Sequence, residues 1–188
     1  MSILRVKICG FGGQGIVLSG YIIGKAVSIY DKKNASMTQS YGPEARGGAC
    51  SSEVVISSDE IDYPLVDTAD VLIALSQEGY GKFSPILREG GILLYDSELV
   101  SIFQPNKKII YSSIPATRIA EKLGGKIVAN IVMLGFAVAQ AKITTPEAMK
   151  ESIKESVPKK YVDLNLKAFD VGYEYKPKSN QQSPKYKN

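Results

Sequence analysis

The stretch "ILRVKICGFGGQGIVLSGYIIGKAV", residues 3–27, decides the fold. Its first part, residues 3–9, is a short apolar run that predicts a buried strand. Residues 14–30 predict a helix with one apolar side. The glycines between them let the backbone turn sharply and approach other groups closely. The segment therefore predicts the strand, turn and helix that begin an open α/β sheet.

The glycine turn "GFGGQG", residues 10–15, also matches the G-x-G-x-x-G fingerprint of dinucleotide-binding proteins. A Rossmann site needs an acid at the end of the second strand to hold the ribose. Asp31 stands at about the right distance, but it follows the predicted helix directly, with no strand between them. We therefore favour a tight strand-to-helix turn, with or without an anion site, over an NAD or FAD site.

The rest of the chain alternates strands and helices, except around residues 35–57, where two strands follow each other. Further strands are expected at 35–40, 49–57, 70–76, 90–96 and 107–113. Helices are expected from 77 to the glycines at 90 and 91, and at 115–125, 127–141, 144–157 and 159–170. Residues 1–173 thus predict one three-layer α/β/α domain with a mixed, mostly parallel sheet. Residues 174–188 predict a polar, basic, flexible tail.

Local signals refine this outline. Gly20 and Gly24 stand at helical spacing and predict a close approach of the first helix to the sheet. Thr144 and Glu147 have the spacing of a capping box at the start of a helix. The run at 127–141 is apolar on nearly every side, so that helix is expected in a core or a subunit interface.

The composition of the chain excludes several classes of protein. The net charge is +4, and the tail contributes most of it, with four lysines against one glutamate. The remaining body is almost neutral, which argues against nucleic-acid binding. No apolar run reaches the roughly 18 residues of a membrane span, and the N-terminus lacks the pattern of a signal peptide. We expect a cytoplasmic protein.

The absence of histidine excludes a Ser-His-Asp triad, a Cys-His pair and a His-ligated metal. Cys9 and Cys50 are the only cysteines, too few for an iron–sulfur cluster or a Cys-only zinc site. Both cysteines border predicted strands, so we expect them to be small buried hydrophobes. No metal site and no catalytic residue is predicted in this chain.

Two loops carry candidate functional residues. In the loop "QSYGPEARGGAC", residues 39–50, the guanidinium of Arg46 is suited to bind a phosphate or carboxylate. Alternatively, the loop is an exposed connection in which Glu44 and Arg46 form a solvated ion pair. "ALSQEGY", residues 74–80, follows a predicted sheet strand, beyond whose end ligands of open sheets bind. For Ser76 itself, capping of the next helix is the favoured alternative. The candidates for an interface are Tyr41, Glu44, Arg46, Gly47, Gly48, Ser76 and Gln77.

Several ordered segments together resemble one family: "GFGGQGIVLSG", "QSYGPEARGGACSSEVVIS", "DYPLV", "ADVLIALSQEGY", "GGILLYD", "PATRIAEKLG" and "VANIVMLG". The chain resembles the γ subunit of 2-oxoacid:ferredoxin oxidoreductases, equivalent to domain III of single-chain pyruvate:ferredoxin oxidoreductase. The sequences of the first two segments are most similar to those of the γ subunit of the 2-oxoglutarate enzyme. A γ subunit for pyruvate or a branched-chain 2-oxoacid, and a stand-alone Rossmann-type nucleotide-binding protein, remain alternatives.

The resemblance implies a complex that converts a 2-oxoacid, coenzyme A and oxidised ferredoxin into an acyl-CoA, CO2 and reduced ferredoxin. Thiamine diphosphate, Mg2+ and iron–sulfur clusters would lie on the α, β and ferredoxin-like δ subunits, and this chain would be non-catalytic. The resemblance places Gly12, Gly13, Gln14, Gly15 and Arg46 at the coenzyme A path or a subunit interface. A subunit taken from such a complex exposes apolar surface, so self-association is expected when it is isolated.

Overall fold

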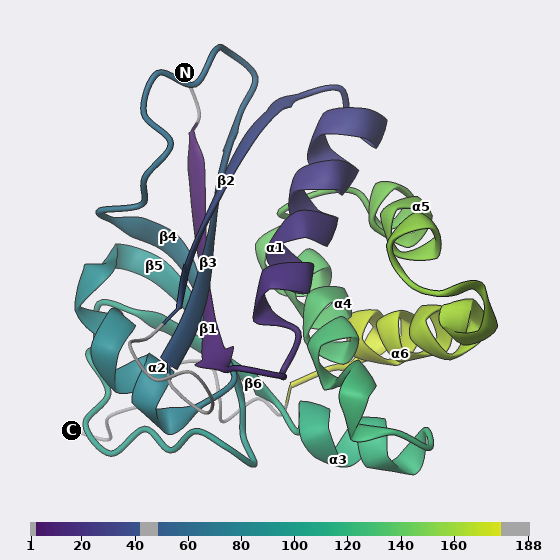
Figure 1. Ribbon diagram of the computed structural model, residues 1–188. Coiled ribbons are helices and arrows are strands. Elements are labelled where there is room, and N and C mark those ends of the chain that lie inside the picture. Colours follow the sequence, from purple (N-terminus) through teal and green to yellow (C-terminus); the bar gives the residue numbers. More distant parts are fainter. Residues whose placement is uncertain (1–2, 42–48, 178–188) are drawn as a thin grey trace.

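The computed structural model describes residues 3–41 and 49–177, and within them the chain forms one six-stranded sheet with helices on both faces (Figure 1). The sheet has the order β2-β3-β1-β4-β5-β6. The strands are β1 (Leu4–Phe11), β2 (Asn34–Tyr41), β3 (Ala49–Ser57), β4 (Ala69–Ala74), β5 (Leu87–Asp96) and β6 (Ile110–Ile114). The helices are α1 (Ile16–Lys25), α2 (Gln77–Phe83), α3 (Ala116–Lys122), α4 (Ala129–Ala141), α5 (Pro146–Ser156) and α6 (Val162–Glu174).

The sheet is mixed and mostly parallel, as the sequence predicts. β3 runs antiparallel to both β1 and β2, while β1, β4, β5 and β6 run parallel to one another. Because β3 is antiparallel to both of them, β2 runs in the same direction as β1. Five strands therefore end at one edge of the sheet, which we call the carboxyl edge, and ligands of open α/β sheets bind there.

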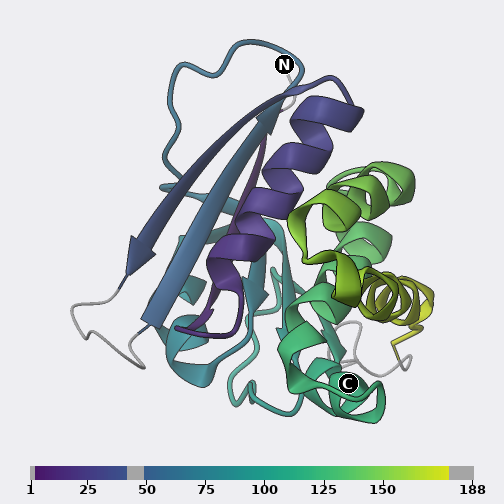
Figure 2. The same cartoon turned by 45° about the vertical axis from the view of Figure 1, so that its right-hand side comes forward.

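The helices form two layers of unequal depth (Figures 1 and 2). α2 covers one face alone, whereas α1 and α4 cover the other face and carry α5 and α6 outside them. The apolar core on the deeper side includes Ile8, Ile23 and Phe136, all fully buried. A smaller core under α2 includes Leu72 and Leu93. Within residues 3–41 and 49–177, no helix is both long and apolar enough to cross a membrane.

Glycine positions two of the closest contacts in the deeper layer. A Cβ built at Gly20 of α1 would lie 2.0 Å from the Ser52 hydroxyl of β3, so the predicted close approach to the sheet is confirmed there. The prediction is wrong for Gly24, whose Cβ would have no atom within 4 Å. Where α4 crosses α6, a Cβ at Gly135 would lie 2.1 Å from the Phe169 carbonyl oxygen. Only glycine fits between these backbones.

The glycines at 90 and 91 do not end a helix, contrary to the sequence prediction. α2 ends at Phe83, and β5 already begins at Leu87 and runs through both glycines. The register between β4 and β5 shifts at this point, and Gly90 has φ 76°. The glycines therefore form a β-bulge, a site where glycine in a strand is common.

The predicted capping box of α5 is also wrong by one residue. Thr145 is the N-cap, and its hydroxyl accepts a hydrogen bond from the Ala148 N–H at 3.3 Å. The Thr144 hydroxyl instead donates to the Asp31 carboxylate at 2.5 Å. α5 begins at Pro146, so the N-cap is the residue directly before the proline. Thr145 caps the helix while also donating to Asp31 at 2.8 Å.

Candidate functional site

The carboxyl edge brings together the candidate residues that lie far apart in the sequence. The glycine turn 12–15 follows β1, Tyr41 ends β2, and Ser76 and Gln77 follow β4. The other candidates, Glu44, Arg46, Gly47 and Gly48, lie outside the described residues. The topology therefore assembles, at one edge, every candidate that the structure describes.

The side chain of Gln14 fixes the glycine turn to the neighbouring strand. Its amide Nε2 donates to the Leu75 carbonyl at 2.9 Å, and its Oε1 accepts from the Phe11 N–H at 2.6 Å. Gly15, with φ 72°, is the N-cap of α1 and offers no side-chain cap. Gln14 therefore positions the turn, and the backbone of the turn is the part left available to a ligand.

Ser76 and Gln77 both bond within the chain. The Ser76 hydroxyl accepts from the Gly79 N–H at 3.0 Å and caps α2, so the capping alternative is confirmed. The Gln77 amide exchanges two hydrogen bonds with the Ser101 backbone, at 2.8 and 3.3 Å. These side chains hold the loop after β5 against α2, which shapes this end of the carboxyl edge.

A pocket of about 480 Å³ opens beside the glycine turn. We call it the turn pocket, and it is lined by Gly13, Gln14, Leu75, Leu99, Thr117, Lys126, Ile127 and Ala129. α1 begins at it without a side-chain cap, and so does the 3-10 turn Lys126–Val128, which runs directly into α4 and whose Lys126 carbonyl accepts from the Ala129 N–H. Free N–H groups at such helical starts favour an anion. Lys126 adds a cation at the same place, with its ammonium paired to the Glu121 carboxylate at 2.8 Å.

Asn130 lies directly behind the turn pocket, in the first turn of α4. Its side chain is 3% exposed, and its Oδ1 has no hydrogen-bond partner. Its Nδ2 makes two long contacts, with the Gly15 carbonyl at 3.4 Å and the Ser19 hydroxyl at 3.5 Å. A Cβ at Gly15 would lie 2.4 Å from that nitrogen, so the glycine turn and α4 fit together only with glycine here.

A buried carboxylate fixes the wall of the turn pocket that Thr117 provides. Asp96, at the end of β5, is fully buried. Its carboxylate accepts from the Thr117 N–H at 2.8 Å and the Thr117 hydroxyl at 2.6 Å, and from the Glu98 N–H at 2.9 Å. These bonds tie the start of α3 to the sheet, so the pocket wall is preorganised.

Exposed apolar side chains lie at the turn pocket. Leu99 and Ile127 line it and are 37% and 82% exposed, and Phe11, next to the glycine turn in sequence, is 37% exposed. We call Phe11, Leu99 and Ile127 the apolar rim; Tyr41, 65% exposed, ends β2 two strands away from β1 and is not part of it. A concentration of exposed aromatic and aliphatic side chains is typical of a protein–protein contact.

Sequence reasoning missed the contribution of the segment 117–130 to the site. Thr117, Lys126 and Asn130 belong to a part of the chain for which the sequence predicted packing helices and no site residue. The available signal was Ile127, an apolar residue preceded by two glycines and a lysine at a helix start. Apolar character alone places such a residue in the core, whereas the structure exposes it.

The two cysteines are buried, as predicted, and have no disulfide. Burial raises the pKa of the Cys9 thiol to about 12, and the nearby Lys7 only partly opposes this. Burial also raises the pKa of Cys50. Thiolates are the reactive form, so neither cysteine is suited to nucleophilic chemistry near neutral pH.

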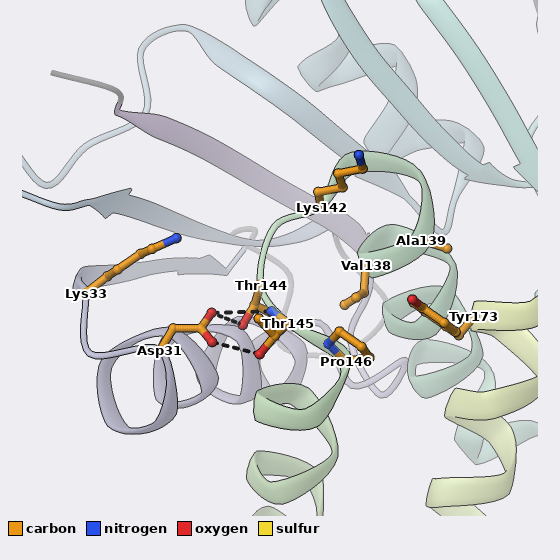
Figure 3. Close-up of a pocket in the computed structure, with 9 residues that line it drawn as sticks. All are labelled: Asp31, Lys33, Val138, Ala139, Lys142, Thr144, Thr145, Pro146 and Tyr173. Atoms are coloured by element: carbon orange, nitrogen blue, oxygen red, sulfur yellow. Dashed lines mark hydrogen bonds between the residues drawn. The ribbon is translucent and has the colours of Figure 1, made fainter.

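Asp31 lies at a second pocket, of about 510 Å³, far from the glycine turn (Figure 3). Its carboxylate accepts from the hydroxyls of Thr144, at 2.5 Å, and Thr145, at 2.8 Å. α1 and the π-helical turn after it separate Asp31 from Gly15 by more than about 20 Å. Asp31 therefore joins the end of this helical segment to α5 and does not face a ligand at the glycine turn.

The chain matches known proteins along almost all of its length. Residues 5–175 match the family described as Pyruvate ferredoxin/flavodoxin oxidoreductase. The 2-oxoglutarate synthase subunit KorC of Methanocaldococcus jannaschii is 50% identical over 172 residues, which cover 90% of this chain and 92% of that subunit.

Solved structures share the fold. The γ subunit of a keto/oxoacid ferredoxin oxidoreductase from Geobacter sulfurreducens matches with a TM-score of 0.85 at 42% identity, over 93% of this chain and 96% of that one. The 2-oxoglutarate:ferredoxin oxidoreductase from Magnetococcus marinus, with 2-oxoglutarate, coenzyme A and succinyl-CoA bound, matches with a TM-score of 0.82 at 26% identity. That match covers 92% of this chain and 30% of the other.

Proposed function

We propose that this chain, which belongs to the pyruvate ferredoxin/flavodoxin oxidoreductase family, is the γ subunit of a 2-oxoglutarate:ferredoxin oxidoreductase. The complex would convert 2-oxoglutarate, coenzyme A and oxidised ferredoxin into succinyl-CoA, CO2 and reduced ferredoxin. The 50% identity to a 2-oxoglutarate synthase subunit supports this substrate over pyruvate or a branched-chain 2-oxoacid. The position of Asp31 argues against the stand-alone Rossmann alternative.

The observation that carries the proposed role is the turn pocket with its apolar rim. The rim would bind the α and β subunits, because its exposed side chains become buried only in a complex. The pocket would then lie at the junction between subunits. The uncapped start of α1, the uncapped start of the 3-10 turn Lys126–Val128 and the Lys126 ammonium would face the phosphates of coenzyme A there, since each supplies positive potential.

Thiamine diphosphate, Mg2+ and the iron–sulfur clusters would be held by the other subunits, including a ferredoxin-like δ chain. In the described residues, no group of three or more Cys, Asp or Glu side chains is placed to hold a metal ion. The residues present fit an anion better than a metal. The chain's part in catalysis would be to shape the coenzyme A path, with no reacting group of its own.

The first experiment tests the assignment to a complex. The native protein is purified from its source cells under gentle conditions, and the co-purifying chains are identified. We expect larger partners that carry thiamine diphosphate and an iron–sulfur chromophore, and coenzyme A-dependent reduction of ferredoxin with 2-oxoglutarate above pyruvate and branched-chain 2-oxoacids. Purification without such partners would contradict the proposed function.

The second experiment tests the turn pocket within the assembled complex. Lys126→Glu places a negative charge at the pocket, so we expect the KM for coenzyme A to rise at least about threefold because phosphate binding weakens. Lys122→Glu, the matched control, changes the same charge on an exposed residue that does not line the pocket. Equal KM values for both variants and the unmodified complex would reject the pocket as part of the coenzyme A path.

The third experiment separates assembly from coenzyme A binding. Ile127→Asp puts a charge into the apolar rim, and we expect loss of the γ subunit from the complex. Arg46→Glu, in the loop outside the described residues, tests the remaining predicted contact. If Ile127→Asp leaves the subunit composition unchanged, the rim is not the assembly surface.

A further inference from the structure

The outer edge of the sheet at β2 is a second surface that the proposed function does not use. β2 is the last strand on its side, and Figure 2 shows it at the border of the sheet, with α1 beside it. No other strand of the described chain pairs with its outer side. A row of backbone N–H and C=O groups along this side is therefore available for pairing.

β2 lacks the features that normally prevent such pairing. Its sequence, "NASMTQSY", contains no charged residue, no proline and no glycine. Its pairing with β3 runs through eight residue pairs without a bulge. Natural edge strands are usually short, charged, bulged or interrupted by proline. β6, at the opposite edge, is only five residues long and mostly buried, so it needs less protection against pairing with another chain.

An apolar groove runs beside this edge, between α1 and β2. The groove has a volume of about 340 Å³, and Ala35 and Met37 of β2 line it together with Gly24 of α1. Tyr21 and Ile29 also line it and are 51% and 50% exposed. An unprotected edge and exposed apolar side chains thus lie on one continuous surface.

We propose that β2 pairs with β2 of a second copy of this chain. The two strands run antiparallel about a two-fold axis perpendicular to the sheet, and the two six-stranded sheets become continuous. α1 of each copy then lies on the same face, so that the two apolar grooves meet across the axis. A two-fold contact of this kind uses the same patch on both subunits.

Charge selects both the partner and the direction. β2 itself carries no charge, and Lys25, which lines the groove, is already paired with Glu155 at 2.7 Å. The strand is therefore complementary to itself, whereas a charged partner strand would find no opposite charge along β2. Lys32 and Lys33 precede β2. In antiparallel pairing they lie at opposite ends of the ladder, about 27 Å apart, whereas parallel pairing would place them side by side. Like charges directly opposite each other destabilise a sheet, so the antiparallel arrangement is favoured.

The two-fold axis also restricts the register. Residues opposite each other in an antiparallel pair point to the same face, so the residue on the axis must face its own copy. The longest overlaps that obey this pair seven of the eight residues of β2: an axis at Met37 pairs residues 34–40, and an axis at Thr38 pairs residues 35–41. Directly opposite residues have Cα atoms about 4.5 to 5.5 Å apart, which suits a disulfide. A single introduced cysteine can therefore report this contact.

The test uses the full chain carrying Met37→Cys or Thr38→Cys, under mild oxidation. Because Cys9 and Cys50 are buried, the new cysteine is the reactive one. We expect covalent dimers from at least one variant, and none from the control Ile110→Cys on the opposite edge strand. If neither variant forms more dimer than the control, the pairing is wrong.

A second measurement does not depend on disulfide geometry. Sedimentation velocity should show the unmodified chain as a dimer at tens of micromolar, with the dimer at least tenfold weaker in Gln39→Lys, because a lysine on an edge strand opposes pairing. Ile110→Lys, on β6, should leave the dimer unchanged, and thermal melting of both variants checks folding. A strict monomer, or equal effects of both lysines, would overturn the proposal.

This inference is independent of the γ-subunit assignment, because β2 and the apolar rim are different surfaces. In the assembled complex, cross-links between two γ chains would support the pairing. Cross-links from residue 37 or 38 only to another subunit would overturn the second copy as the occupant, even with the proposed function intact.

Discussion

Glycine has opposite roles at the α4–α6 crossing and at the turn between β1 and α1. At the crossing, Gly135 and Gly172 lie against backbone, and a Cβ at Gly172 would lie 2.0 Å from the Val132 carbonyl oxygen. At the turn, Gly12 and Gly13 face open space, and a Cβ would have no atom within 4 Å. The crossing uses glycine to close the fold, whereas the turn uses it to leave backbone accessible.

The difference teaches where function can change without loss of structure. A residue fixed by contacts on all sides tolerates no added atom, because packed interiors have no spare volume. A residue facing solvent or a pocket contributes little to stability and is free to serve a ligand or a partner subunit. Gly15 belongs to both classes, since it caps α1 at the pocket and also contacts Asn130.

The largest effect is expected from Gly135→Ala. The added methyl would meet the Phe169 carbonyl, which is backbone and cannot rotate away, so α4 and α6 must separate. We expect a loss of at least about 3 kcal/mol in the free energy of unfolding, measured by urea denaturation. The control Ala139→Gly, in the same helix, should cost only about 1 kcal/mol through helix propensity. A smaller loss for Gly135→Ala than for the control would contradict the close crossing.

Gly15→Ala is expected to cost roughly 1–3 kcal/mol, because alanine is strained at φ 72° and its methyl would meet the Asn130 side chain. The double variant Gly15→Ala/Asn130→Ala removes the steric part and isolates the backbone part. Relative to Asn130→Ala alone, the double variant should still lose about 1–2 kcal/mol in the free energy of unfolding. If nothing remains in urea denaturation, the left-handed backbone at residue 15 is not a source of strain.

Gly24→Ala is expected to stabilise the protein by about 1 kcal/mol, because alanine is the better helix former and the site is open. Thermal and urea unfolding measure the gain, with Gly20→Ala as the matched variant in the same helix. Gly20→Ala should destabilise, since its methyl would meet Ser52 of β3. The same sign for both variants would show that α1 does not approach the sheet as described.

The smallest effect on stability is expected from Gly12→Ala, within about 0.5 kcal/mol of the unmodified chain. Its methyl enters open space beside the turn pocket. In the assembled complex, however, the same change should raise the KM for coenzyme A, because backbone near the proposed phosphate position becomes less accessible. If Gly12→Ala destabilises the chain as much as Gly15→Ala does, a side chain at residue 12 does not enter open space as described.

The sequence predicts the sheet and its layers well because strands and helices here have clear apolar periodicity. The pair of strands at 34–57 and the serine cap of α2 follow from local residue types alone. The bulge at Gly90 and the hydrogen bond of Thr144 do not, because each depends on a partner distant in sequence. For the glycines that partner is β4, and for Thr144 it is Asp31.

The candidate site is only partly predictable for the same reason. The glycine turn and the loop after β4 are recognisable from composition. Lys126 lines the turn pocket and Asn130 lies behind it only because α4 packs across the start of α1, a long-range arrangement that local residue types do not specify. The exposure of Ile127 likewise depends on where α4 begins relative to the sheet.

The strand order has a consequence for synthesis on the ribosome. β1 emerges first, yet both of its neighbours, β3 and β4, are made later. The nascent sheet must therefore grow outward from its middle, with the β2–β3 hairpin docking as a unit on one side before the parallel strands add on the other. Until α5 and α6 leave the exit tunnel, the sides of α1 and α4 that these helices cover stay exposed, and α1 waits the longer, since its partner Ser152 lies 130 residues after Ile22.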